Sequence, residues 1–145
     1  MAKGASQLNR SAMHLLHRAG QCATDIFTSE ARASGLTARQ FAVLMAVSEE
    51  EGLTQTDLVE RTGIDRSTLA DIVGRLLSHG LIQRRRAKED ARAYAIKLTP
   101  QGAKVLREAQ PGAATADTRL LANLPPAKRQ DFLDSLGLIV TTARK

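Results

Sequence analysis

One predicted helix carries a row of polar side chains whose chemistry suits recognition of a base edge. At 100° per residue, the helix expected over residues 66–79 gathers four of them within about 100° of arc. The four are Ser67, Thr68, Asp71 and Arg75. Arg75 could donate to guanine or to a phosphate, and Asp71 could accept from cytosine or orient Arg75 one turn away. Gly74 beside them would permit close approach of a duplex. The alternative is an ordinary solvated helix face.

The segment after this helix is rich in basic residues. The candidate phosphate contacts there are Arg84, Arg85, Arg86, Lys88 and Lys97. Such contacts give an affinity that does not depend on the base sequence. The logarithm of that affinity falls by about 0.9 per released counterion for each unit of the logarithm of the salt concentration. Arg66, at the edge of the polar arc, is also expected to meet a nucleic-acid backbone rather than a base. A basic hairpin by itself is more often a solvated turn.

Three short helices are expected to position these side chains. Thr37 and Gln40 have the spacing of a capping box, and Thr54 with Asp57 repeats that spacing. Asp65 is expected to cap the helix that bears the polar arc, and Gly63 is expected to end the helix before it. Two helices separated by a tight glycine turn, the second with a polar exposed face, are typical of a helix-turn-helix.

After residue 80 the chain changes from helical to alternating periodicity. Residues 81–86 and 93–98 indicate two short strands, and Tyr94, Ile96 and Leu98 share one face of the second. The polar residues 87–92 between them are turn-like. A helix-turn-helix followed by a basic hairpin predicts a winged helix over residues 37–99, which we call the central lobe.

The two ends of the chain are expected to form long amphipathic helices. Residues 6–33 place apolar side chains on one stripe, and residues 126–143 do the same. A further helix is expected from Thr99-Pro100 to about residue 122, with a kink or break at Pro111-Gly112. These apolar stripes exceed what the central lobe can cover. Pairing with the same helices of a second copy predicts a two-fold homodimer.

Composition narrows the classes of function. Hydrophobic residues make up 43% of the 145, and the formal net charge of +6 favours an acidic partner such as nucleic acid. The single cysteine, Cys22, excludes an internal disulfide framework, and no apolar run is long enough to span a membrane. The N-terminal residues lack the apolar stretch of a secretory signal. We therefore expect one cytoplasmic domain over residues 1–145.

The order and spacing of several motifs resemble the MarR family of bacterial transcriptional regulators. The matching stretches are residues 53–63, 65–69, 75–76, 80–84, 89–92 and 98–102. The resemblance implies a mainly α fold with a small β-hairpin wing. It assigns residues 37–99 to a winged helix-turn-helix lobe, and residues 1–35 and 100–145 to dimerisation helices. It also implies a homodimer that binds a near-palindromic operator in double-stranded DNA, often represses, and is often released by a small aromatic effector.

The resemblance also assigns roles within the hairpin. Asp90 and Arg92 match the family's pairing of an aspartate with an arginine that enters the minor groove. A neighbouring carboxylate would hold the flexible arginine ready for insertion, which lowers the entropy lost on binding. The complete predicted DNA-binding set is Thr54, Gln55, Arg66, Ser67, Thr68, Asp71, Arg75, Arg84, Arg86, Lys88, Asp90 and Arg92.

Polar residues on the first helix could bind an effector. In the family, ligands lodge where the first, second and fifth helices meet, so His14, His17 and Arg18 could receive an anionic aromatic acid or a related thioester. A solvent-facing polar stripe is the competing and simpler interpretation.

Metal, cofactor and catalytic chemistry are not expected. His14, His17 and Cys22 spread over roughly 140° of the first helix, too far for one ion to be bound by all three. Cys22 borders the apolar stripe, which favours a buried, unreactive thiol over a redox sensor. The chain has no glycine-rich phosphate loop and no nucleophile elbow. The alternative function is a winged-helix protein-interaction module, which would show no salt-dependent binding to duplex DNA.

Overall fold

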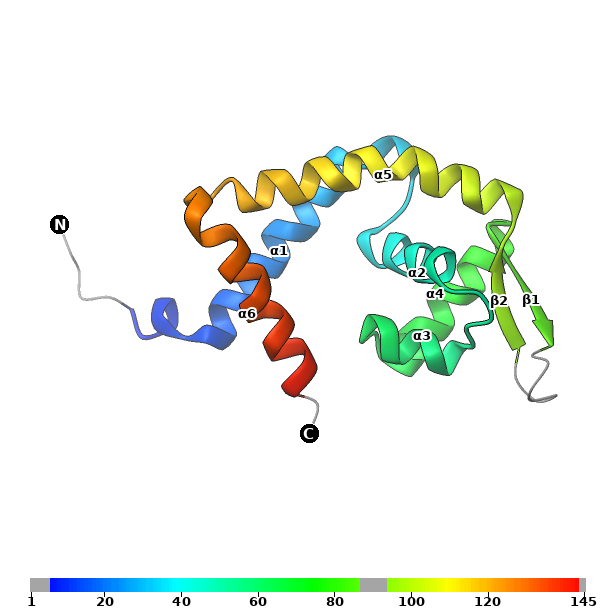
Figure 1. Cartoon of the computed structure of the whole chain (residues 1–145), viewed down its shortest axis with the longest axis horizontal. Helices are drawn as coiled ribbons and strands as arrows, with labels where there is room; N and C mark the ends of the chain where they lie inside the picture. The colour runs from blue at the N-terminus through cyan, green and yellow to red at the C-terminus, as the bar shows by residue number, and fades with distance from the viewer. Residues whose placement is uncertain (1–5, 87–93, 144–145) are drawn as a thin grey trace.

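The computed structural model describes residues 6–86 and 94–143, and within them the chain is mainly helical with one antiparallel two-stranded sheet. The α-helices and strands are α1 (Ala12–Glu30), α2 (Ala38–Glu49), α3 (Gln55–Thr62), α4 (Arg66–Ser78), β1 (Ile82–Arg86), β2 (Tyr94–Leu98), α5 (Pro100–Leu121) and α6 (Arg129–Thr142). Three 3-10 helices lie at Leu8–Arg10, Arg32–Ser34 and Pro126–Lys128. The central lobe lies beneath the first half of α5, and α1 runs beside its second half (Figure 1). The predicted fold class, mainly α with a hairpin wing, is confirmed.

The helices begin where side chains cap them. The Thr37 hydroxyl accepts from the N–H of Gln40 at 3.1 Å, and the Gln40 side chain accepts from the N–H of Thr37 at 3.1 Å, which confirms the capping box. Thr54 and Asp57 form the second box, at 3.2 and 2.9 Å. Ser11 caps α1, so the first α-helix begins after it rather than at residue 6.

One apolar cluster holds the central lobe together and includes the start of α5. Leu44 of α2, Leu58 of α3 and Leu69 of α4 are completely buried in it. Ile96 of β2 is buried as well, and its N–H donates to the carbonyl of Leu53 at 2.8 Å. This bond fastens the hairpin to the turn before α3. Because each fully buried leucine contributes roughly 1.5–3 kcal/mol relative to an exposed one, the central lobe has a substantial core of its own.

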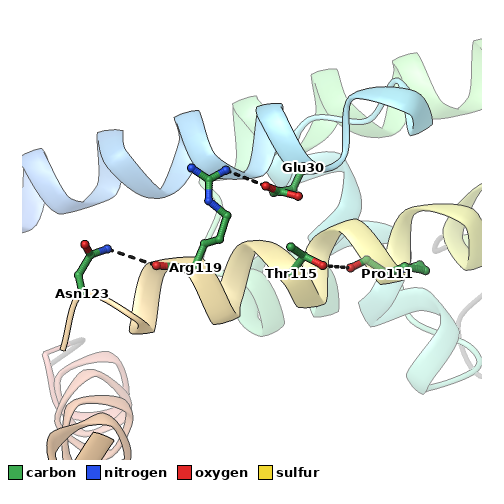
Figure 2. A network of polar contacts seen from close by, with 5 residues as sticks. All are labelled: Glu30, Pro111, Thr115, Arg119 and Asn123. Atoms are coloured by element: carbon green, nitrogen blue, oxygen red, sulfur yellow. Dashed lines mark hydrogen bonds and ion pairs between the residues drawn. The ribbon is translucent and has the colours of Figure 1, made fainter. Parts of the chain in front are cut away.

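A seam between α1 and α5 connects the two ends of the chain (Figure 2). Arg119 of α5 donates to the carboxylate of Glu30 of α1 at 2.7 Å. Gly112 allows the two backbones to approach closely, since a Cβ at that position would lie 2.5 Å from the carbonyl oxygen of Glu30. An exposed ion pair contributes at most about 1 kcal/mol. Close backbone packing therefore decides the geometry of the seam more than charge does.

A second, smaller apolar cluster occupies this seam. It contains Phe27 and Ala31 with Ala113 and Ala116 of α5. The ring of Phe27 lies 5.6 Å from the ring of Phe41 in α2, tilted by 53°, a favourable arrangement for two aromatic rings. Phe41 packs against both clusters. Its side chain thus links the central lobe to α1 and α5.

Two expectations about the ends, a break at Pro111-Gly112 and a buried Cys22, are wrong. No break occurs at Pro111, which lies inside a continuous α5. Proline removes one backbone donor, and we attribute the continuity to packing of α5 on the central lobe before Pro111 and on α1 after it. Cys22 is exposed rather than buried. The reason is that α1 packs on the rest of the chain mainly near its C-terminal end, where Phe27 is its one buried residue.

Apolar side chains stay exposed on α6 and on the first half of α1. No side chain of α6, Arg129–Thr142, is buried. The large exposed apolar residues on these elements and the turn before α1 are Leu8, Met13, Leu15, Leu16, Leu133, Leu138, Ile139 and Val140. Large exposed apolar side chains in such number are typical of an interaction surface. Across residues 6–86 and 94–143, we find no helix with the length and apolarity needed to cross a membrane.

Candidate nucleic-acid interface

α4 has one apolar face and one polar face, as its sequence pattern predicts. The buried side chains are Leu69, Ile72, Val73 and Leu76, whereas the exposed residues include Arg66, Ser67, Asp71, Gly74 and Arg75. A Cβ added at Gly74 would meet nothing within 4 Å, so the surface there is open to an approaching molecule. The predicted polar arc therefore lies on the outside of the central lobe, apart from Thr68, which is half-buried.

Asp71 and Arg75 form an ion pair across one turn of this face. Oδ2 of Asp71 accepts from Nε of Arg75 at 3.1 Å. Both side chains are about two-thirds exposed, at 65% and 66%, and an exposed pair at this spacing stabilises a helix by only about 0.3–0.5 kcal/mol. Its main effect is to orient the arginine. Because Nε makes this bond, both terminal nitrogens of the guanidinium can still donate elsewhere.

Asp65 and Thr68 fix the start of α4. The backbone N–H of Thr68 donates to Oδ1 of Asp65 at 2.8 Å, and its hydroxyl donates to Oδ2 at 2.8 Å. These two bonds, the backbone one foremost, hold the pKa of Asp65 below its usual value, and the charge of Arg39 acts in the same direction. The Thr68 hydroxyl proton is thus used in the cap. Ser67, which is exposed, is better placed to reach a base.

α3 positions the predicted contacts that precede α4. Thr54 and Gln55 stand at its N-terminus, and both are half-buried. Arg66 of α4 reaches back to α3, where its Nη1 donates to the hydroxyl of Thr56 at 3.2 Å. This bond ties the first turns of the two helices together. A helix N-terminus also favours a phosphate, because its free N–H groups and dipole attract an anion.

The hairpin carries further basic residues. Its strands pair from Ile82 opposite Leu98 to Arg86 opposite Tyr94. Arg84 and Arg86 are exposed. The guanidinium carbon of Arg86 lies 5.7 Å from the ring centroid of Tyr94. This contact was not predicted, because the sequence pattern indicated only a strand position for Tyr94. Three predicted wing residues lie outside the described residues: Lys88, Asp90 and Arg92.

An open hollow of about 350 Å³ lies beside α4. Its lining comes from α1, the start of α2 and α4: Thr24, Thr37, Ala38, Arg39, Gln40, Thr68, Asp71, Ile72 and Arg75. Arg39 and Thr24 were not predicted from the sequence as site residues. The capping box did place Arg39 in the first turn of α2, but no spacing indicates that α1 and α4 meet there.

The predicted effector residues of α1 do not line this hollow. His14 is half-buried, whereas His17 and Arg18 are exposed. Among the described residues, no group of three or more histidine, cysteine or acidic side chains is arranged to hold a metal ion.

A second hollow, also about 350 Å³, lies between the end of α2 and α3 and is mainly acidic. It is lined by Glu50, Glu51, Gly52, Leu53, Asp57, Glu60 and Arg61. Arg61 donates to Glu50 at 2.8 Å, which offsets part of this negative charge. The remaining carboxylates repel phosphate, so this surface is unsuited to nucleic acid.

Comparisons with known proteins agree with the arrangement of α3, α4 and the hairpin. A family model described as MarR family matches residues 34–93. The HTH-type transcriptional repressor NicR from Pseudomonas putida is 32% identical over 120 residues, which cover 83% of this chain and 76% of NicR.

Two solved structures superpose on nearly the whole chain. A structure on the regulation of DNA binding of Bordetella bronchiseptica BpsR by 6-hydroxynicotinic acid gives a TM-score of 0.86 at 30% identity, covering 94% of this chain and 97% of BpsR. The transcriptional repressor CouR, bound to a 23-mer DNA duplex, gives 0.85 at 27% identity, covering 96% of this chain and 99% of CouR. The chain therefore belongs to the MarR family of DNA-binding transcriptional regulators.

Proposed function

We propose that the protein is a cytoplasmic, non-catalytic homodimeric repressor whose α4 enters the major groove of operator DNA. The observation that carries this proposal is the polar face of α4, on which Asp71 orients Arg75 and Gly74 leaves open space. A groove-reading helix needs donors and acceptors that are exposed and already oriented. In support, NicR is a named repressor and CouR is known with a duplex bound.

Each part of the interface has a distinct role in this proposal. Arg75 donates to a guanine or a phosphate, and Ser67 contacts a neighbouring base or phosphate. Thr54 and Gln55 position α3 on the backbone, with Arg66 beside them. Arg84, Arg86 and Lys88 supply phosphate contacts, and Asp90 orients Arg92 for the minor groove. Phosphate contacts set the register and the base contacts set specificity.

The proposed dimer uses the exposed apolar residues of α1 and one apolar stripe of α6, on which Leu133, Ile139 and Val140 are exposed. Residues 1–35 and 100–145 then act as dimerisation helices, and residues 37–99 as the DNA-binding lobe. A charge-poor apolar surface of this extent is best covered by its own two-fold copy, because the same stripe on both chains is self-complementary. The two copies of α4 should meet half-sites about one helical turn, roughly 34 Å, apart.

An aromatic acid is the proposed effector. The hollow beside α4 offers two arginines, Arg39 and Arg75, and it touches the proposed reading face directly. A carboxylate bound there would draw Arg75 away from DNA and favour an arrangement of the lobe that no longer fits two successive grooves. His14, His17 and Arg18 remain the alternative effector residues on α1. The link between BpsR and 6-hydroxynicotinic acid supports this class of ligand.

Selection from a library of duplexes with a randomised core tests the function directly. We expect enrichment of a near-palindrome. Against the selected duplex, Arg75→Ala should weaken binding by about 5- to 150-fold, since a bidentate base contact accounts for about 1–3 kcal/mol. Binding is measured by fluorescence anisotropy.

Lys128→Ala is the matched control, because it removes one positive charge near the start of α6. Its effect should be less than about twofold. The proposal would be overturned if no duplex is enriched, or if both variants weaken binding equally. If adding 6-hydroxynicotinic acid and other aromatic acids leaves the affinity unchanged, the effector part of the proposal fails by itself.

A further inference from the structure

A hydrogen bond between two exposed side chains joins the first turns of α3 and α4. Nη1 of Arg66, the first residue of α4, donates to the hydroxyl oxygen of Thr56 in α3 at 3.2 Å. Leu58 of α3 and Leu69 of α4, by contrast, are completely buried. The bond therefore lies on the solvent side of the two helices, which pack against each other in the central lobe (Figure 1).

The hydroxyl of Thr56 is not used within its own helix. Thr54 and Asp57 form the cap of α3 without it. Thr24 and Thr62, which lie further along their helices, donate to the carbonyl four residues earlier, at 3.1 and 2.6 Å. Thr56 stands in the first turn, so the residue four positions before it lies outside the helix. Its hydroxyl is therefore available to a side chain of another helix.

A short turn keeps Thr56 and Arg66 in a fixed relation. Only residues 63–65 separate α3 from α4, and Ile64 among them is buried. Asp65 caps α4 through its two bonds to Thr68. Because the two helices also pack on each other, Thr56 has a defined position from which to hold the Arg66 guanidinium.

The group that orients Arg66 differs from the group that orients Arg75 on the same helix. Asp71 offsets the positive charge of Arg75, with which it forms an ion pair. The Thr56 hydroxyl is neutral, and among residues 6–86 and 94–143 no carboxylate forms an ion pair with Arg66. Arg66 thus keeps its full charge, which favours contact with a phosphate.

The Arg66 guanidinium can still donate to a ligand. Its bond to Thr56 uses Nη1, and within the described parts of the chain its Nε and Nη2 donate to no other group. An arginine loses rotamer freedom when it binds a phosphate, and a partner that restricts the side chain beforehand lowers that loss. Valine in place of Thr56 would keep the branched shape but remove the acceptor, whereas serine would keep the acceptor.

We propose that Thr56 is a positioning residue, which holds Arg66 ready for a phosphate of the DNA backbone. This inference rests on the proposed function, because it presumes that α3 and α4 meet a duplex. Thr56 acts through Arg66 and need not touch DNA itself. The competing role is a bond that only stabilises the packing of α3 on α4, regardless of any ligand.

A double-mutant cycle separates the two roles. The probe is the duplex enriched by the full-length protein, and fluorescence anisotropy measures its affinity between about 50 and 200 mM salt. Thr56→Val should weaken binding about two- to tenfold, the range that corresponds to ordering one flexible side chain in advance. In the Arg66→Ala background the same change should have no effect. Thr56→Ser should bind like the unmodified protein.

Salt dependence tests the phosphate contact itself. Arg66→Ala should reduce the logarithmic salt slope by about 0.9 for each phosphate that the variant no longer neutralises. Thr56→Val removes no charge, so it should change the slope less than Arg66→Ala does.

Two further variants serve as controls. Thr115→Val replaces an exposed threonine of α5, whose hydroxyl donates to the carbonyl of Pro111 at 3.0 Å, and it should leave the affinity unchanged. Thr56→Ala removes the same hydroxyl as Thr56→Val with a smaller side chain. It takes the place of Thr56→Val if circular dichroism melting curves show that valine is not tolerated.

Any of four results would overturn the inference. They are an equal loss of affinity from Thr56→Val with and without Arg66, no loss from Thr56→Val, a Thr56→Ser variant as weak as Thr56→Val, and an unchanged salt slope in Arg66→Ala. In each case the unmodified protein still binds its duplex, so the proposed function stands. If the unmodified protein enriches no duplex, the proposed function fails, and this inference fails with it for that separate reason.

Discussion

The central lobe and the two ends of the chain differ in how completely they bury their own apolar side chains. The largest fully buried side chains, Leu44, Leu58, Leu69, Leu76, Ile96, Val43 and Val73, all belong to the central lobe. α1 buries only Phe27, and α6 buries nothing. Apolar side chains are thus buried within the lobe and exposed on α1 and α6.

The lobe covers its apolar side chains with its own chain, whereas α1 and α6 leave theirs exposed for another molecule to cover. The lobe needs only its own elements and the first half of α5 to form its core. The ends gain their missing burial from a second copy under the proposed function. Stability of the lobe and association of the ends should therefore respond to different substitutions.

The largest expected effect is loss of association when a charge is placed on the apolar stripe of α6. Val140→Asp should raise the dimer dissociation constant at least about 30-fold, the effect of removing an interface side chain that contributes about 2 kcal/mol. Sedimentation equilibrium over a concentration series measures it. The far-ultraviolet circular dichroism of the lobe helices should persist.

Leu138→Asp is the matched control for that substitution. Leu138 is exposed to a similar degree, 64% against 69% for Val140, but lies about 160° away around the helix. Its substitution should leave the dissociation constant nearly unchanged. Equal effects of the two aspartates would contradict the placement of the dimer interface on this stripe.

A smaller effect is expected at the seam that joins the two regions. Gly112→Ala places a Cβ 2.5 Å from the Glu30 carbonyl oxygen, so α1 and α5 must move apart. Overpacking of this kind costs about 1–3 kcal/mol, partly offset by the higher helix propensity of alanine. The net free energy of unfolding should fall by about 1 kcal/mol in urea titrations.

Gly137→Ala provides the contrast within α6. A Cβ at Gly137 meets nothing within 4 Å, so alanine there should raise the stability by up to about 1 kcal/mol. If Gly112→Ala were also stabilising, the seam would not be as closely packed as described.

The smallest effect concerns the start of α4. The pKa of Asp65 is lowered in the folded protein, so its charge stabilises the fold above the unfolded-state pKa, about 3.9, and that contribution is lost as the pH falls through the folded-state value. Asparagine can also cap a helix but does not ionise. The melting temperatures of the original protein and Asp65→Asn should therefore differ most near neutral pH and converge below about pH 4.

Asp131→Asn, in the first turn of α6, controls for loss of one negative charge from the start of a helix. The α6 start has no side-chain cap bond, so this variant should not reproduce the pH profile of Asp65→Asn. A profile shared by both variants would show that the cap at Asp65 is not the cause.

Local features of the fold were predictable from the sequence because their causes lie within a few residues. The boxes at Thr37 and Thr54 and the cap at Asp65 each depend on bonds between a side chain and a backbone N–H three residues apart. The exposed polar arc of α4 was predictable because the spacing of its residues matches the period of an α-helix. Its roles in DNA recognition stay predictions.

Features that depend on which elements meet were not predictable. Pro111 suggested a break because a single sequence does not reveal packing on both sides of α5. Arg39 and Thr24 share a hollow only because α1 crosses near α2 and α4. Cys22 borders an apolar stripe, but that stripe packs on this chain only near the C-terminal end of α1.

The shared ring of Phe41 has a consequence for how the protein can move. Any tilt of the lobe against α1 must slide this ring across Phe27 while it also stays packed against the lobe core. Densely packed interiors settle into discrete arrangements rather than deforming smoothly. The lobe should consequently switch between a few angles, each of which keeps Phe41 packed on both clusters.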